Sequence, residues 1–208
     1  TITVDGVTST STPLTLIANS GASAVNFSSN ASSFGNLTVD TGTGGVGFGV
    51  NVSTANLTVA SGGAVNFGGD LTTTGNLNVT SGGAITNTGA LTIGGTANFT
   101  ADVADQAITL SNTSNSFTGA VSLNTLGTSG GATLTSNNAV TLSTSTIGGD
   151  LNVTVGGGNS LNVTGAATAG GLISLLADDD IIFTASGDLT TTTGNISVTA
   201  NNDSDSSG

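Results

Sequence analysis

The side chains of this sequence that could act as acids, bases or metal ligands are carboxylates, and all of them belong to aspartate. The chain of 208 residues has 12 acidic residues and no Lys, Arg, His or Cys. A Ser-His-Asp or Cys-His arrangement is therefore excluded, because no base is present to activate a nucleophile. Disulfides and thiolate metal sites are excluded for want of cysteine.

Asp178, Asp179 and Asp180 form a local group of carboxylates, with Asp188 close behind. A glycosidase needs two carboxyl groups in different environments, one with a raised pKa, and here no cation stands beside them to bind a substrate. We therefore predict that the chain is not an enzyme and carries no cofactor. Asp178–Asp180 remain candidates for a Ca²⁺ site, since Ca²⁺ takes carboxylate and carbonyl oxygens. The favoured alternative is a solvated corner that protects a strand edge from aggregation.

The formal net charge of −12 reflects missing cations rather than abundant acid, because only 6% of the residues are charged. Ordinary domains have about 25%. We expect no nucleic-acid partner, since phosphate contacts rest largely on Lys and Arg, and no polybasic membrane-surface site. We also expect no membrane insertion, because no apolar run reaches the length of about 18 residues that a spanning helix needs.

A repeat with a period of about 20 residues, in the range typical of solenoids, organises the sequence. GNLTV at Gly35–Val39 recurs as ANLTV at Ala55–Val59 and as GNLNV at Gly75–Val79. GGAVNF at Gly62–Phe67 and DLTTTG at Asp70–Gly75 are each followed by a similar segment one period later. One repeat therefore contains three strand-like segments separated by corners rich in glycine, which allows turns with positive φ.

The alternation within these segments predicts a coil with an apolar interior. Residues i and i+2 share one face of a strand, and adjacent strands lie about 4.8 Å apart. We predict an all-β protein, a parallel β-helix (β-solenoid) with three short strands per coil of about 20 residues and roughly ten coils, about 50 Å long. The predicted core ladder comprises Leu37, Val39, Leu57, Val59, Leu77, Val79 and Phe99.

Asparagine recurs with the same period, immediately before the aligned leucines. Asn36, Asn56 and Asn76 are predicted to stack into an amide ladder along the axis, as asparagines do in stacked parallel strands. The alternative is that these residues are simply turn or surface positions.

The register loosens after Ala101, where Ala101–Gln106 (ADVADQ) reads as an insertion at a corner. Strand-like segments continue, and the segment DLTTTTGNISV near the end is similar in sequence to DLTTTGNLNV, which begins at Asp70. We therefore predict a single solenoid domain over residues 1–208. Its regular coils span about residues 31–101 and less regular coils span 102–200, while 201–208 form a polar tail or a linker to further sequence.

The run GNLNVTSGGAITNTGALTIGGTANFTA (Gly75–Ala101) resembles the repeat region of filamentous-haemagglutinin-like adhesins, which bacteria export by two-partner or autotransporter-type secretion. LLADDDIIF and GDLTTTTGNISVTA look similar to the same family. The resemblance implies a right-handed β-helix, export across the cell envelope, and a role as shaft or adhesive surface. The chain departs from the family in lacking Lys and Arg, and the family's secretion domain is not recognisable.

Three functions remain open, all at an extracellular or cell-surface location. The first is a structural rod, either the shaft of an adhesin or a fibre subunit that stacks head to tail on copies of itself. The second is an adhesive module that binds carbohydrate or another ligand on a host or neighbouring cell. The third is an ice-binding solenoid, although outward positions 38, 58, 78 and 98 read Thr, Thr, Asn and Asn, which interrupts a threonine array.

Overall fold

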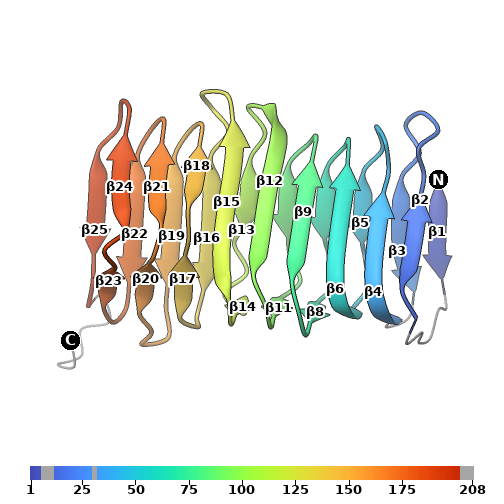
Figure 1. Cartoon of the computed structure of the whole chain (residues 1–208), viewed down its shortest axis with the longest axis horizontal. Coiled ribbons are helices and arrows are strands. Elements are labelled where there is room, and N and C mark those ends of the chain that lie inside the picture. The colour runs from blue at the N-terminus through green and yellow to red at the C-terminus, as the bar shows by residue number, and fades with distance from the viewer. Residues whose placement is uncertain (6–11, 30–31, 202–208) are drawn as a thin grey trace.

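The computed structural model describes residues 1–5, 12–29 and 32–201, and in this part of the chain all regular secondary structure is β-strand. The strands form two parallel sheets that run the length of a rod (Figure 1). Among the described residues, no helix has the length and apolar character needed to span a membrane.

One sheet receives one strand from each coil. Its ten strands pair in this order: β1 (Ile2–Asp5), β3 (Val25–Ser29), β5 (Val46–Phe48), β7 (Val65–Phe67), β10 (Ile85–Asn87), β13 (Ile108–Leu110), β16 (Ala132–Ser136), β19 (Leu151–Val155), β22 (Ile173–Ala177) and β25 (Ile196–Thr199). The other sheet receives the rest of each coil. Its 15 strands are β2 (Leu14–Ile17), β4 (Ser32–Asp40), β6 (Val52–Ser61), β8 (Leu71–Thr73), β9 (Leu77–Ser81), β11 (Leu91–Ile93), β12 (Ala97–Ala104), β14 (Ser116–Phe117), β15 (Ala120–Leu126), β17 (Val140–Leu142), β18 (Ser145–Ile147), β20 (Leu161–Val163), β21 (Ala166–Ala169), β23 (Ile181–Phe183) and β24 (Asp188–Thr191).

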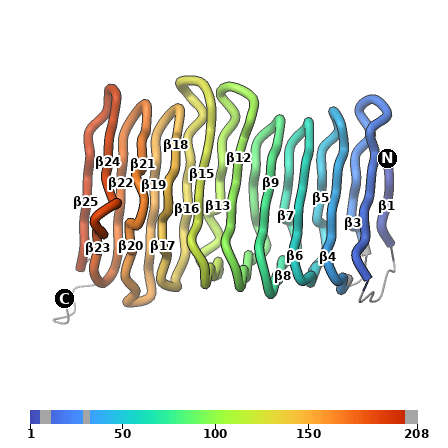
Figure 2. The backbone as a smooth tube through the Cα atoms, viewed as in Figure 1, coloured from blue at the N-terminus to red at the C-terminus, as the bar shows by residue number. Residues whose placement is uncertain are grey.

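The coil is a right-handed parallel β-solenoid of about 9 turns with about 21 residues per turn. In Figure 1 the chain rises along the near sheet, crosses at the top and descends along the far sheet as it advances from the N to the C end. The tube in Figure 2 shows the coils stacked side by side along one axis. The predicted fold class is thereby confirmed, with slightly fewer and longer turns than the sequence period indicated.

Three strand segments per coil are seen as predicted, for example β7, β8 and β9. From β7 to β24, two of every three strands lie in the 15-stranded sheet, and in the coils of β4 and β6 these two are fused into one long strand. The fused strand β6 contains no glycine and β4 contains Gly35, whereas one coil after β6 the segment around Gly75 separates β8 from β9. A coil therefore has two broad faces joined at two rims.

The core lies between the two sheets and runs unbroken from coil to coil. Leu37 pairs with Leu57 and Leu57 with Leu77, while Val59 pairs with Val79 and Val79 with Phe99. All seven residues of the predicted core ladder are buried. Each pairs with its counterpart one coil away, because the 20-residue period of the sequence equals the length of these coils.

A phenylalanine column on the ten-stranded sheet joins three successive coils. The rings of Phe27 and Phe48 stack with centroids 4.8 Å apart, and those of Phe48 and Phe67 with centroids 5.0 Å apart. The column follows from the strand register, in which Phe27 pairs with Phe48 and Phe48 with Phe67. In the next coil Asn87 takes the equivalent position.

Candidate binding surfaces

Short polar side chains on the rims hold successive coils together. Asp70 Oδ1 accepts a hydrogen bond from the Ala90 backbone N–H at 2.8 Å, and Asp150 Oδ1 accepts one from Leu172 N–H at 2.7 Å. Strands in neighbouring coils lie about 4.8 Å apart, a gap that the one-methylene side chain of Asp or Asn bridges. The carboxylates therefore take backbone N–H groups as partners, in a chain without Lys, Arg or His.

The predicted asparagine ladder forms in part. Asn56 Nδ2 donates to Asn36 Oδ1 at 2.9 Å, which is the amide-to-amide bond expected. One coil later the pattern changes, because Asn56 Oδ1 accepts the backbone N–H of Asn76 at 2.7 Å, and Asn76 Oδ1 accepts that of Thr96 at 2.9 Å. The residue before the donor Asn76 is Gly75. A larger residue would not fit there, because a Cβ at this position would collide with Asn56 Oδ1.

A second amide ladder escaped the sequence reading. Asn98 Nδ2 donates to Asn78 Oδ1 at 2.8 Å, on the outward face of the 15-stranded sheet. The two residues pair directly between β9 and β12. Their 20-residue separation in GNLNV and TANFT was the signal that could have revealed this ladder.

Buried hydroxyl groups were also missed. Ser61 Oγ lies 2.9 Å from the carbonyl oxygens of both Gly44 and Gly63, which share its one O–H group, and Ser81 Oγ lies 2.8 Å from Gly63 O. These inward serines stand where each coil turns from one sheet to the other. Gly44 O also accepts the backbone N–H of Gly63 at 2.9 Å, so the hydroxyl group of Ser61 adds a second contact at this corner.

The structure does not bring Asp178, Asp179 and Asp180 together as ligands of one metal ion. Asp178 Oδ2 accepts from Gly158 N–H at 3.3 Å, Asp179 Oδ2 accepts from Ser160 Oγ at 2.7 Å, and Asp180 is exposed. Each carboxylate is directed to a different neighbour, so their oxygens do not converge. Over residues 1–5, 12–29 and 32–201 no group of three carboxylates is placed to hold a metal.

The insertion predicted at residues 101–106 is an extension shared by two coils. β12 continues to Ala104 and β15 to Leu126, and their last residues pair across a register shift. We call residues 102–106 and 126–129 the rim ridge; they rise above the neighbouring corners in Figure 1. Val103 and Leu126 on this ridge are 48% and 51% exposed.

Asp105 fixes the shape of the rim ridge. Its backbone has a positive φ of 65°, which turns the chain back toward the ten-stranded sheet. Its Oδ1 accepts the backbone N–H groups of Thr128 and Ser129, both at 2.9 Å. The bond from Ser129, followed by that from Thr128, lowers the pKa of Asp105 below its ordinary value of 3.8.

Replacing Asp105 by asparagine tests this contact through pH. A lowered folded-state pKa stabilises the folded protein above the unfolded value, and this stabilisation is lost as pH falls through the folded pKa. Wild type is therefore expected to melt at a higher temperature than Asp105→Asn at pH 7. This difference in melting temperature should vanish well below pH 3.8. Asp180→Asn, at an exposed carboxylate outside the ridge, is the control, and an equal pH-dependent difference there would contradict the assignment.

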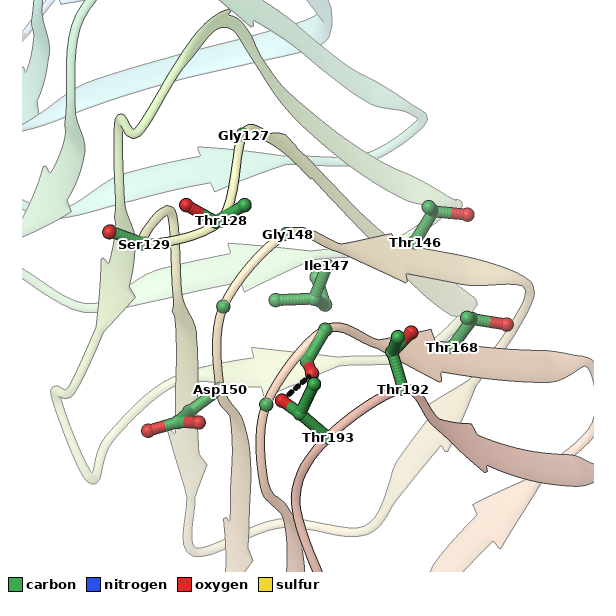
Figure 3. A pocket seen from close by; sticks show the side chains of 13 residues that line it. Gly127, Thr128, Ser129, Thr146, Ile147, Gly148, Asp150, Thr168, Thr192 and Thr193 are labelled. Atoms are coloured by element: carbon green, nitrogen blue, oxygen red, sulfur yellow. Dashed lines mark hydrogen bonds between the residues drawn. The ribbon is translucent and has the colours of Figure 1, made fainter.

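A groove of about 520 Å³ lies on the C-terminal side of the rim ridge. Corner segments of four successive coils line it, around residues 127–129, 146–150, 168–171 and 192–193. We call this hollow the rim groove. Figure 3 shows the ridge residues Thr128 and Ser129 at one end, Ile147 at the base, and Asp150 on the opposite side from Thr146 and Thr168.

Threonine hydroxyl groups line one side of the rim groove with the period of the coil. Thr146 pairs with Thr168, and Thr192 and Thr193 line the groove in the following coil. Thr193 Oγ1 donates to Gly170 O at 2.6 Å, the dashed line in Figure 3. The hydroxyl groups of Thr146 and Thr168 make no hydrogen bond within the part of the chain that is described, so they are available to a ligand.

The last coil exposes side chains that the preceding coil buries. Phe183 pairs with Val163, Ile196 with Ile173 and Val198 with Leu175, so all three continue inward columns of the core. Phe183 is nevertheless 42% exposed, Ile196 46% and Val198 44%. We call these three residues the terminal apolar face.

Comparison with protein families gives one match, to a family described as repeats of unknown function (DUF5649), over residues 54–124. The matched part runs from β6 to β15 and so contains the most regular coils. Searches of curated proteins and of solved structures gave no match. The family match thus supports a repeat protein and the structure shows the β-solenoid fold, while the finer resemblance to filamentous-haemagglutinin-like adhesins gains no specific support from the comparisons.

Proposed function

We propose that this protein is a non-enzymatic extracellular structural protein, a rod that forms the shaft of a surface adhesin or a fibre subunit. The observation that carries the proposal is the single core between two sheets of parallel strands, which continues through every coil without interruption. Stacked repeats of this kind propagate along one axis, because each repeat contacts only its neighbours. A shaft must be stiff over its length, and we expect a continuous core of this kind to provide that stiffness.

The polar surface supports the same proposal. Outward positions of the strands carry mainly Thr, Ser and Asn, and the chain has no Lys or Arg at which a trypsin-like protease could cut. Asp70 and Asp150 on the rims each hold a backbone N–H group of the next coil and so join the coils. Resistance to trypsin-like proteases and a surface dominated by small polar side chains suit a long-lived extracellular material.

The terminal apolar face supports contact with a further coil. A parallel strand laid against β25 and β24 would cover Ile196 and Val198 and would pair the free strand edge, whose unpaired backbone groups favour association. We propose that this coil comes from the N-terminal end of a second copy or from a longer chain. A head-to-tail contact that does not close on itself gives an open filament.

The first test is electron microscopy of the protein from its native source. Uniform filaments would support a fibre subunit, and thin shafts extending from a cell surface would support an adhesin shaft. Compact particles confined to the cell interior would contradict both forms of the proposal.

The second test replaces Ile196 and Val198 by aspartate together. Two carboxylates on the terminal apolar face resist desolvation, so end-to-end association of the purified chain should fall by at least about tenfold. Sedimentation equilibrium measures this association, and circular dichroism checks that the coils remain folded. The matched control is Thr154→Asp with Ser174→Asp on the outward face of the same sheet; association lost equally in both double variants would contradict a contact through the end face.

A further inference from the structure

We propose that the rim groove binds a neutral or amine-bearing polysaccharide strand laid along the rod axis. This goes beyond the structural role, because it assigns a ligand class to one defined part of the surface. The groove has a volume of about 520 Å³ and spans the corners of four coils. That size falls within the range of roughly 300–1,000 Å³ seen for small-ligand sites.

The hydroxyl groups in the groove match a ligand that is itself rich in hydroxyl groups. A threonine hydroxyl group both donates and accepts a hydrogen bond. Thr146 and Thr168 lie in register on adjacent strands, about 4.8 Å apart along the axis. This spacing is close to the advance per sugar of an extended β-1,4-linked strand, so two successive sugars would each lie opposite a threonine hydroxyl group, one presenting each of its edges in turn.

Asp150 faces these threonines from the other side of the groove. Its Oδ1 is fixed by the Leu172 backbone N–H at 2.7 Å, which sets the orientation of the carboxylate. The other oxygen has no hydrogen-bond partner among the described residues. A carboxylate oxygen held in this way accepts strongly from a sugar hydroxyl or ammonium group.

Apolar side chains at the ridge end complement the hydroxyl groups. Ile147 closes the base of the groove from the core and is only 2% exposed, so the apolar surface open to a ligand is that of Val103 and Leu126, which stand exposed on the ridge beside the groove. Sugars present C–H faces as well as hydroxyl groups, and pockets for such ligands combine apolar walls with a few placed polar groups. The bonds from Thr128 and Ser129 to Asp105 hold the ridge in place before any ligand arrives.

Charge restricts the ligand further. The chain has a formal net charge of −12 and no side-chain cation, and both Asp150 and Asp105 lie at or beside the groove. Uronate, sialylated or sulfated glycans would be repelled.

The experiment titrates the 208-residue chain with three hexasaccharides: cellohexaose, the glucosamine hexamer and hexagalacturonate. Binding is followed by isothermal calorimetry and by amide NMR shifts. We expect the first two to bind, with shifts concentrated at the groove, and the acidic hexamer not to bind. The double variant Thr146→Val and Thr168→Val keeps side-chain shape and removes two hydroxyl groups, so affinity should fall by roughly tenfold.

The control variant is Thr38→Val with Thr58→Val, which alters an outward pair on β4 and β6 far from the groove. Asp150→Asn retains the oxygen that accepts from Leu172 and should weaken the glucosamine hexamer more than cellohexaose. Absence of binding by wild type, preference for the acidic hexamer, binding of only a protein partner, or equal loss in the control pair would each overturn the proposal. None of these outcomes bears on the rod itself, which is checked by electron microscopy of the same variants.

Discussion

Replacing Phe48 by alanine is expected to lower the free energy of unfolding by about 3–5 kcal/mol, the range for removing a buried aromatic side chain. Phe48 is 1% exposed and is the middle ring of its column. It stacks on Phe27 with an interplanar angle of 13° and on Phe67 with one of 8°. Truncation therefore leaves a cavity between two rings held by neighbouring coils, which the backbone pairing prevents from closing.

Urea denaturation followed by circular dichroism measures this loss. Phe183→Ala is the matched control, because it makes the same change at a phenylalanine that is 42% exposed and has no stacked partner among the described rings. We expect it to cost less than about 1.5 kcal/mol, since little apolar area leaves water there. Similar losses for the two variants would mean that the phenylalanine column is not a main source of coil-to-coil stability.

The contrast between these phenylalanines shows what the repeat could predict. Leu57, Val59, Leu77 and Val79 were placed in the core because their 20-residue period fixes both register and face. Phe48 lies in GVGFGV, where glycines obscure the alternation, and only its pairing with Phe67 reveals the column. A period read from one family of segments therefore locates the interior, but not every residue that fills it.

The candidate surfaces were harder to foresee than the core. ADVADQ was recognisable as an insertion, yet the ridge also needs the loop of the next coil, whose Thr128 and Ser129 donate to Asp105. The rim groove joins corners from four coils of differing lengths. Sequence spacing alone does not place such corners in register, because each insertion shifts the residues that follow.

Buried polar groups mark a further limit of reading by pattern. Asn115 lies in SNTSNSF, a segment whose composition is typical of a solvent-exposed loop. In the structure it is 0% exposed and belongs to the interior where the phenylalanine column ends. Its Oδ1 accepts from Asn87 Nδ2 at 2.8 Å and from the Leu91 backbone N–H at 3.0 Å. Its Nδ2 donates to Thr135 O at 3.1 Å.

Replacing Asn115 by alanine is expected to cost about 2–6 kcal/mol, because at least two buried polar groups lose their partner at about 1–3 kcal/mol each. The amide joins three consecutive coils, through Leu91, its own coil and Thr135. Asn87 would suffer most, because its Oδ1 already lacks a partner among the described residues and its Nδ2 would keep only Gly89 O. Urea denaturation of the full chain measures the loss.

Asn98→Ala is the control, because Asn98 is exposed and bonds to one neighbouring amide; it should cost no more than about 1 kcal/mol. Asn115→Asp separates shape from hydrogen bonding, since it keeps both acceptor contacts but turns an oxygen toward Thr135 O. It should therefore be at least as destabilising as alanine at neutral pH and should recover part of that loss on acidification, when the protonated carboxyl group can again donate. If Asn115→Ala and Asn98→Ala were equally tolerated, the stack would be held by apolar columns alone, and the buried amide would be incidental to the joining of the coils.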